Sequence, residues 1–184
     1  MKSNLMLIED HLLKSAKQIQ SPNYSERLNE DDINLIVIHS ISLPPGKYNN
    51  SYIEEFFCNK LSVNENKYFE SISDLKVSSH ILIKRDGKII QFVPFNKKAW
   101  HAGESVFKGR LNCNEFSIGI ELEGCEEDDF TQNQYKNLVN ICLTLFKYYP
   151  EITRQNVVGH SEIAPGRKTD PGKNFNWEYL RENL

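Results

Sequence analysis

The sequence of 184 residues has no apolar run long enough to cross a bilayer, which takes about 20 residues. Near the amino terminus, the apolar residues 5–8 are followed at once by Glu9 and Asp10. This stretch is far too short for a signal-peptide core, and no small-residue cleavage site follows it. These absences argue against a membrane protein and predict a cytoplasmic protein that makes no membrane contact.

An excess of basic charge is also missing, since 22 Lys and Arg residues stand against 25 Asp and Glu residues and the net charge is −3. No local run of basic residues forms a positive patch, so the composition argues against nucleic acid as the main ligand. The four cysteines form no C-x-x-C pair, which argues against a cysteine zinc site. A chain of this size does not need disulfides, and we expect free thiols at Cys58, Cys113, Cys125 and Cys142.

Internal repeats, low-complexity segments and long linkers are absent, so residues 1–184 are predicted to form a single domain. Residues 34–39 are apolar and β-branched on both alternating faces, which is typical of a strand buried on both sides. The Asp86-Gly87 pair predicts a hairpin that joins strands 79–84 and 88–93. Residues 117–123 predict a further strand.

Helices are predicted at residues 51–60, 68–75 and 131–149, and from about residue 176 to the end. The longest begins with a capping box from Thr131 to Gln134. Its apolar residues recur at helical spacing and are expected to pack on the sheet: Leu138, Ile141, Cys142, Leu145 and Phe146. Because strands and helices interleave, the sequence predicts an α/β domain with a mixed sheet flanked by helices.

His39 stands at the carboxyl end of the first buried strand, where ligands collect in open α/β sheets. From this segment alone, a metal ligand and a hydrogen-bonded core histidine are equally consistent. His80 lies inside an apolar strand and is predicted to be structural, whereas His11 is predicted to be exposed.

Residues 159–172 form a loop rich in glycine and proline that carries His160, Lys168 and Asp170. Asp170 precedes Pro171, which biases its backbone toward an extended conformation. In an extended segment, Lys168 and Asp170 point to the same side, so an ammonium and a carboxylate would face one place. The alternative is an exposed ion pair on a surface loop.

The strand at residues 117–123 places Ser117, Gly119, Glu121 and Glu123 on one face. This face is either solvated or, because Gly119 removes bulk beside Glu121, open to a ligand. Because both glutamates are at odd positions of the strand, this alternation (parity) does not tell which of them would face a ligand. Trp100 and His101, followed by Ala-Gly, either line a carbohydrate or peptide groove or pack in the interior.

These residue types are the ones that metal-dependent hydrolysis requires. Zinc binds His nitrogens and Asp oxygens, and a catalytic site uses three protein ligands with one position open for water. A glutamate can accept the proton of that water and return it to the leaving amine. A lysine can stabilise the oxyanion of the tetrahedral intermediate. The sequence offers a candidate for each role, although the two histidines are far apart along the chain.

Taken together, the motifs resemble the type 2 N-acetylmuramoyl-L-alanine amidases, which are related to peptidoglycan recognition proteins. The nearest resemblance is to the cytoplasmic members that act on anhydro-muropeptides in bacterial cell-wall recycling. It extends over residues 21–177 and rests on four ordered blocks: His39 with residues 41–46, Trp-His-Ala-Gly at 100–103, residues 116–124, and Gly-His at 159–160 through residues 168–172.

The resemblance implies zinc bound by His39, His160 and Asp170 in a surface cleft of a mixed sheet flanked by helices. It implies that Glu121 is the catalytic glutamate and that Lys168 stabilises the oxyanion. The implied reaction hydrolyses the amide between the lactyl group of 1,6-anhydro-N-acetylmuramic acid and L-alanine of the stem peptide. The partner is then a small-molecule muropeptide, with no obligate protein partner.

Ser40, Trp100 and His101 are the expected substrate contacts. Ser40 stands where this family is expected to have Asn, and Lys76 and Asn112 stand where Arg is expected. A lysine does not replace a bidentate arginine contact, so these departures concern substrate affinity and not the metal chemistry.

Two alternatives to the recycling enzyme remain open from the sequence. One is an amidase that acts on intact peptidoglycan, as a lysin does. The other is a module that binds muropeptides without cutting them. Such modules typically lack a complete set of zinc ligands, whereas this sequence contains all three ligands together with Glu121 and Lys168.

Overall fold

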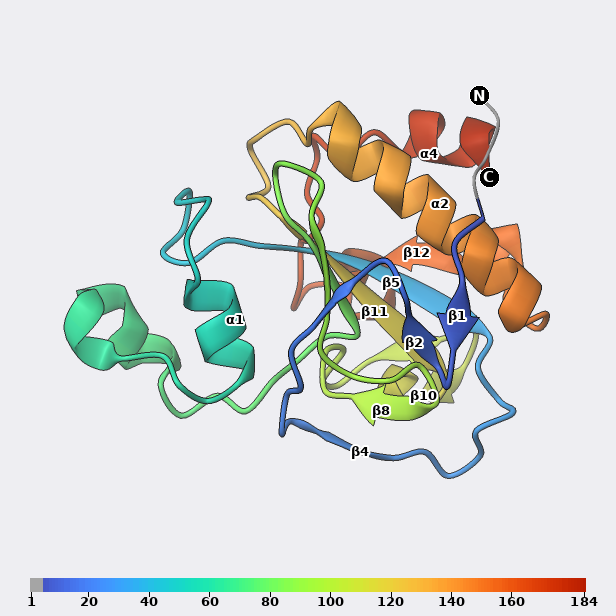
Figure 1. Ribbon diagram of the computed structural model, residues 1–184, viewed down its shortest axis with the longest axis horizontal. Coiled ribbons are helices and arrows are strands. Elements are labelled where there is room, and N and C mark those ends of the chain that lie inside the picture. Colours follow the sequence, from blue (N-terminus) through green and yellow to red (C-terminus); the bar gives the residue numbers. More distant parts are fainter. Residues whose placement is uncertain (1–4) are drawn as a thin grey trace.

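The centre of the protein is a mixed sheet of six strands in the order β12-β5-β11-β6-β7-β3, in a computed structural model that describes residues 5–184. Figure 1 shows β5 and β11 side by side in this sheet. The strands β5 (Leu35–Ile41) and β11 (Ser117–Glu123) are parallel and form its middle. β12 (Val157–Gly159) and β6 (Ile81–Ile83) add to them in parallel. β7 (Ile89–Gln91) is antiparallel to β6, and β3 (Lys17–Gln18) pairs with β7 at the far edge. The predicted mixed α/β sheet is therefore confirmed.

The two central strands are buried on both faces, which explains their apolar and β-branched residues. All seven residues of β11 are buried, so the face that carries Glu121 and Glu123 is not solvated. Register places Glu121 beside His39 and Leu122 beside Ser40. The polar residues of the two strands therefore meet at the carboxyl end of the sheet.

α2 (Gln132–Tyr148) lies along one side of the sheet with α4 (Trp177–Asn183) next to it (Figure 1). The predicted capping box is present: the Thr131 hydroxyl accepts from the Gln134 backbone N–H, and the Gln134 side chain accepts from the Thr131 N–H. Leu138, Ile141, Cys142 and Leu145 are buried in one cluster with the apolar residues of β11. Both helix predictions are confirmed.

The hairpin is confirmed with shorter strands than predicted, and Gly87 supplies the positive φ of +90° that its turn needs. The predicted helix at 51–60 is reduced to α1 (Tyr52–Phe57). The predicted helix at 68–75 is present but shorter, and residues Lys67–Ile72 form a 3₁₀ helix and not an α-helix. Only Phe69 of this segment is buried, so no continuous apolar face stabilises an α-helix there.

The sequence patterns did not reveal several short elements, whose two or three residues are too few to show a period. A single turn, α3 (His160–Ile163), opens the segment predicted to be entirely loop. The remaining strands pair as β1 (Ile8–Glu9) with β2 (Leu12–Leu13), β4 (Tyr24–Glu26) with β8 (Lys97–Ala99), and β9 (Val106–Phe107) with β10 (Arg110–Leu111). Further 3₁₀ helices span Val63–Glu65, Cys113–Glu115 and Arg154–Asn156.

All four cysteines are free thiols, as the sequence predicts, and Cys113 and Cys142 are buried. Over residues 5–184, none of the helices combines the length and the apolar character that crossing a membrane requires.

Candidate metal centre

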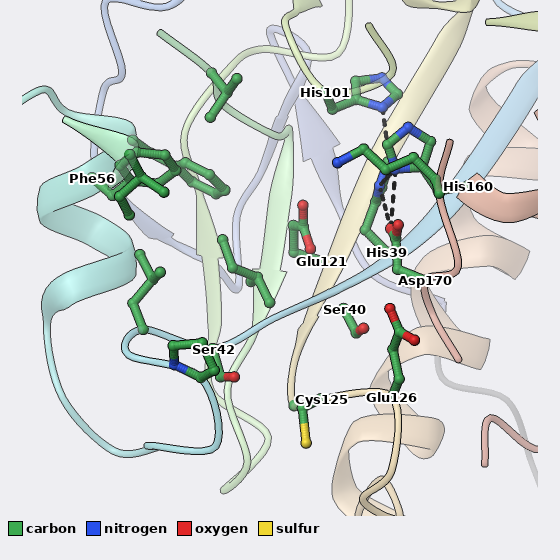
Figure 2. A pocket seen from close by; sticks show the side chains of 18 of the residues that line it. His39, Ser40, Ser42, Phe56, His101, Glu121, Cys125, Glu126, His160 and Asp170 are labelled. Carbon is green, nitrogen blue, oxygen red and sulfur yellow. Dashed lines mark hydrogen bonds and ion pairs between the residues drawn. The ribbon is translucent and has the colours of Figure 1, made fainter. Parts of the chain in front are cut away.

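His39, His160 and Asp170 come together although they are distant in the sequence (Figure 2). His39 is carried by β5, and His160 begins α3 directly after β12, the neighbouring strand. The loop after α3 folds back so that the Asp170 carbonyl accepts from the Ser161 backbone N–H at 3.0 Å. Gly159 permits this close approach, because a Cβ there would lie 2.9 Å from Cδ of Pro171.

The three candidate ligand atoms form a nearly equilateral triangle. Nδ1 of His39 lies 3.0 Å from Nδ1 of His160, and each of these nitrogens lies 3.1 Å from Oδ2 of Asp170. Nitrogen and oxygen ligands held tetrahedrally at zinc bond lengths are about 3.3 Å apart. The triangle therefore needs to open by only a few tenths of an ångström to fit one such ion. This cluster of two histidines and one carboxylate could hold a metal ion.

The charge states of the cluster suit metal binding. Burial is the main cause that lowers the pKa of His39 to about 4, so its imidazole is neutral at neutral pH. Burial alone would raise the pKa of Asp170, but its hydrogen bonds with His160 and His39 outweigh burial and hold that pKa below its ordinary value. A neutral imidazole and an ionised carboxylate are the forms in which these side chains bind metals.

The structure separates the two glutamates of β11, which parity left equivalent. Glu123 is fully buried, and its carboxylate is already occupied: it receives the Lys84 ammonium at 3.1 Å and the backbone N–H groups of Asn49 and Arg85, each at 3.0 Å. Oε2 of Glu121, in contrast, is a buried oxygen that has no hydrogen-bond partner among residues 5–184. Burial, followed by the charge of Asp170, raises the pKa of Glu121 well above its ordinary value. Within the described part of the chain, the carboxylate of Glu121 thus keeps an oxygen for a ligand, whereas both oxygens of Glu123 are engaged.

Glu121 and the triangle border one surface cleft of about 450 Å³ (Figure 2). Lys168 and Asp170 both line this cleft, as the prediction that they point to one side requires. One part of the wall is polar and includes Glu126 and Glu127. The other part, on the side of Phe56 in Figure 2, is apolar and includes Leu43, Phe56, Phe57, Ile72, Leu75 and Val77. This apolar wall was not predicted from the sequence, because its residues come from separate short segments that show no common period.

The three expected substrate contacts lie in different surroundings. Ser40 lines the cleft beside the triangle. His101 also lines it but is only 9% exposed, and its ring nitrogens contact His39 and Ser117. The Trp100 indole N–H donates to the Ser25 hydroxyl, and Trp100 is not among the described residues that line the cleft.

The other two departures from the family pattern, Lys76 and Asn112, lie on the surface. Lys76 is exposed, between Leu75 and Val77 of the apolar wall. Asn112 is exposed in a left-handed backbone conformation with φ of +60°. Neither side chain is among the described residues that line the cleft.

Residues 29–173 match the family described as N-acetylmuramoyl-L-alanine amidase. The chain belongs to this family. It is therefore a hydrolase of amide bonds, and the family resemblance predicted from its motifs is confirmed.

Two curated relatives that carry the same name match this amidase over nearly their whole length. It is 50% identical over 171 residues to the 1,6-anhydro-N-acetylmuramyl-L-alanine amidase AmpD of Haemophilus influenzae, covering 93% of each chain. It is 45% identical over 176 residues to the protein of the same name from Escherichia coli K12, covering 96% of each. A crystal structure of a selenomethionine AmpD derivative superimposes with a TM-score of 0.94 at 45% identity, over 97% of this chain and 99% of the other. The fold predicted from the sequence is thus confirmed by a solved structure.

Proposed function

We propose that this amidase is zinc-dependent and hydrolyses the amide between the lactyl group of 1,6-anhydro-N-acetylmuramic acid and L-alanine of a stem peptide. The observation that carries the proposal is the triangle of His39, His160 and Asp170 in one cleft with the unpaired carboxylate oxygen of Glu121. The 45–50% identity to amidases named for this bond supports the choice of substrate.

Zinc suits the proposed ligands His39, His160 and Asp170 because it binds two imidazoles and one carboxylate readily and leaves a fourth position open. When bound, it would acidify a water molecule and polarise the scissile carbonyl. The three side chains are held by hydrogen bonds and burial, with only Asp170 exposed by as much as 14%. Because these side chains are already fixed, they need to move little to bind one ion.

Glu121 is proposed to be the general base and then the general acid. Glu121 as a residue is 8% exposed, and its raised pKa makes it a stronger proton acceptor than an ordinary glutamate. It would take a proton from the attacking water as the oxygen–carbon bond to the lactyl carbonyl forms. When the carbon–nitrogen bond breaks, it would give that proton to the amine of L-alanine. The products are the free lactyl carboxylic acid on the sugar and a stem peptide with a free amino terminus.

Lys168 is proposed to stabilise the oxyanion that forms on the lactyl carbonyl. Its side chain lines the cleft, and its backbone N–H is fixed by donating to the Ala164 carbonyl at 3.0 Å. An ammonium at this place also offsets the negative charge of Glu121 and Asp170, since it acts to lower the pKa of Glu121.

A muropeptide matches the two-sided cleft, which can receive polar sugar and peptide groups on one wall and apolar groups on the other. A related structure is described as a complex of the amidase AmiD from E. coli with the substrate anhydro-N-acetylmuramic acid-L-Ala-D-gamma-Glu-L-Lys. It is 31% identical, with a TM-score of 0.60 over 83% of this chain and 57% of the other. We extend the proposal to residues 1–184 as one amidase domain that acts in the cytoplasm on recycled fragments.

The test is mass spectrometry of two substrates incubated with the zinc-loaded protein: a purified anhydro-muropeptide and intact sacculi. We expect about one zinc per chain, the stoichiometry of a three-ligand site, and release of the stem peptide from the anhydro-muropeptide. The Glu121→Ala variant should bind zinc and release nothing. Cleavage of sacculi alone would instead assign the protein to intact peptidoglycan, and tight binding without cleavage would assign it to muropeptide recognition.

A further inference from the structure

His101 lies directly behind His39, on the side away from the metal triangle (Figure 2). Its Nδ1 is 2.9 Å from Nε2 of His39, and its Nε2 is 3.1 Å from the Ser117 hydroxyl. The space for this ring exists because position 119 is glycine: a Cβ there would lie 2.5 Å from Cγ of His101. The room beside Glu121 that the sequence suggested for a ligand is therefore filled by the protein itself.

His39, His101, Ser117 and the Cys113 carbonyl form a hydrogen-bond chain, and the backbone carbonyl fixes the direction of its hydrogen bonds. The Ser117 hydroxyl lies 2.6 Å from the carbonyl oxygen of Cys113, and only the hydroxyl has a proton to place between the two oxygens. The hydroxyl therefore donates to Cys113 and has only a lone pair left for Nε2 of His101. Nε2 of His101 must then carry a proton, which leaves Nδ1 of a neutral His101 as an acceptor.

We propose that His101 and Ser117 are positioning residues that hold the proton of His39 on Nε2. In this arrangement the His39 Nε2–H donates to Nδ1 of His101, the His101 Nε2–H donates to Ser117, and the Ser117 hydroxyl donates to the Cys113 carbonyl. Nδ1 of His39 is then unprotonated, and its lone pair faces His160 and Asp170. The inference rests on the proposed function because it gives this lone pair the role of a zinc ligand.

His160, the second proposed ligand histidine, is held in the same way by residues 101–102. Nε2–H of His160 donates to the carbonyl oxygen of Ala102 at 3.0 Å, so its Nδ1 is also left unprotonated toward the triangle. The segment itself is fixed because Oδ1 of Asn114 accepts from the backbone N–H groups of His101 and Ala102, at 3.1 and 2.8 Å. Residues 101–102 therefore orient both imidazoles from behind, one by a side chain and the other by a carbonyl.

Without this hydrogen-bond chain, the metal-free His39 has a competing tautomer. A proton on Nδ1 would donate to Oδ2 of Asp170, 3.1 Å away, and that proton would have to leave before zinc could bind. The Ser117 hydroxyl disfavours this state. If the hydrogen bonds ran in the opposite direction, the hydroxyl would have to donate to His101, and its hydrogen bond to the Cys113 carbonyl would be lost. The predicted effect of breaking the chain is therefore a loss of zinc affinity.

The test compares Ser117→Ala with Ser105→Ala by competition with a chromophoric zinc chelator. Ser105 is a matched control: it is a buried serine of the same region whose hydroxyl donates to the Gly103 carbonyl and accepts from the Cys113 N–H, outside the chain to His39. We expect Ser117→Ala to weaken zinc binding about tenfold and His101→Phe, which keeps a ring in the space beside Gly119, about 10- to 100-fold. Ser105→Ala should leave the affinity unchanged.

A second measurement separates this inference from the proposed function. Long-range ¹H–¹⁵N correlation spectra of the metal-free protein report which ring nitrogen of His39 carries the proton. We expect the proton on Nε2 in the wild type and in Ser105→Ala, and a mixture of both tautomers in Ser117→Ala. A proton on Nδ1 of His39 in the wild type, or equal zinc affinities of the two serine variants, would overturn the inference. Absence of zinc binding or turnover in the wild type would instead refute the proposed function, whatever the tautomer.

Discussion

Glu121→Gln and Glu123→Gln form a pair of substitutions on one strand for which the structure predicts opposite effects. Glutamine keeps the shape of both side chains and removes their charge. Because Oε2 of Glu121 has no hydrogen-bond partner in the part of the chain that the structure describes, the substitution at this position breaks no ion pair there. Glu123 is 0% exposed and receives the ammonium of Lys84, which is itself buried. The same chemical change therefore removes a catalytic group at one position and a structural anchor at the other.

The stability cost at Glu123 follows from what is left behind. Removing one partner of a buried ion pair costs about 3–5 kcal/mol, because the other charge remains buried. Glu54 lies 3.5 Å from the Lys84 ammonium and offsets part of this cost, so we expect roughly 2–4 kcal/mol. For a chain of this length, that cost lowers the melting temperature by roughly 5–15 °C. Glu121→Gln should leave the melting temperature unchanged or raise it, since it removes an unpaired buried carboxylate.

The assay measures three quantities for each zinc-saturated variant: melting temperature, zinc content and turnover of an anhydro-muropeptide at a temperature where the variant is folded. For Glu121→Gln we expect normal zinc content and a rate that is lower by about 10²- to 10⁴-fold, the usual contribution of a general base. Glu123→Gln should keep most of its rate per folded molecule. A wild-type melting temperature for Glu123→Gln would refute the argument from the buried pair. Equal loss of turnover in both folded variants would refute the assignment of the base.

Three further predictions test other parts of the structure. Burial, together with the charge of Arg27, lowers the pKa of His80 to about 3, so its contribution to stability is complete above pH 6.5 and is lost as the pH falls. His80 alone should add a slope of up to about 1.4 kcal/mol per pH unit to the free energy of unfolding, and the difference between wild type and His80→Gln in urea unfolding from pH 7 to 4 isolates this share. Gly119→Ala should cost about 1–3 kcal/mol, because its Cβ would overlap His101, and calorimetry would detect this loss even in metal-free protein. Removal of zinc with a chelator should abolish turnover and lower the melting temperature. Zinc at a concentration a thousandfold above its dissociation constant should raise the free energy of unfolding of the metal-free protein by about 4 kcal/mol.

Much of the fold could be predicted from the sequence because its main elements carry a clear period. The buried strand at His39, the hairpin at Gly87 and the capped helix after Thr131 each have local signals that tertiary packing did not override. The helix near residue 68 was predicted without its 3₁₀ type and with a later end than Ile72, since a single buried side chain gives too little information about the turn type. Strands of two residues show no period at all.

The metal triangle could be predicted only through the family motifs. His39 and His160 are brought together by the pairing of β5 with β12, and no local pattern in either segment encodes that neighbour. The choice between Glu121 and Glu123 likewise depends on Lys84 and Asn49, which come from other segments. The position of Ser117 on the same strand face as Glu121 was visible in the sequence, but its role depends on His101 filling the space at Gly119.

The strand β11 shows why catalysis and stability can be tested separately in this protein. Its odd-numbered residues each serve a different purpose: Ser117 contacts the histidine behind the site, Gly119 gives that ring room, Glu121 borders the cleft and Glu123 holds Lys84. The even-numbered residues between them belong to the apolar core under α2. Because side chains alternate strictly along a strand, a shift of register by one residue would bury these polar groups in the core and move the apolar ones to the site. The seven paired positions that align β11 with β5 therefore fix the register, and with it the placement of Glu121 beside His39.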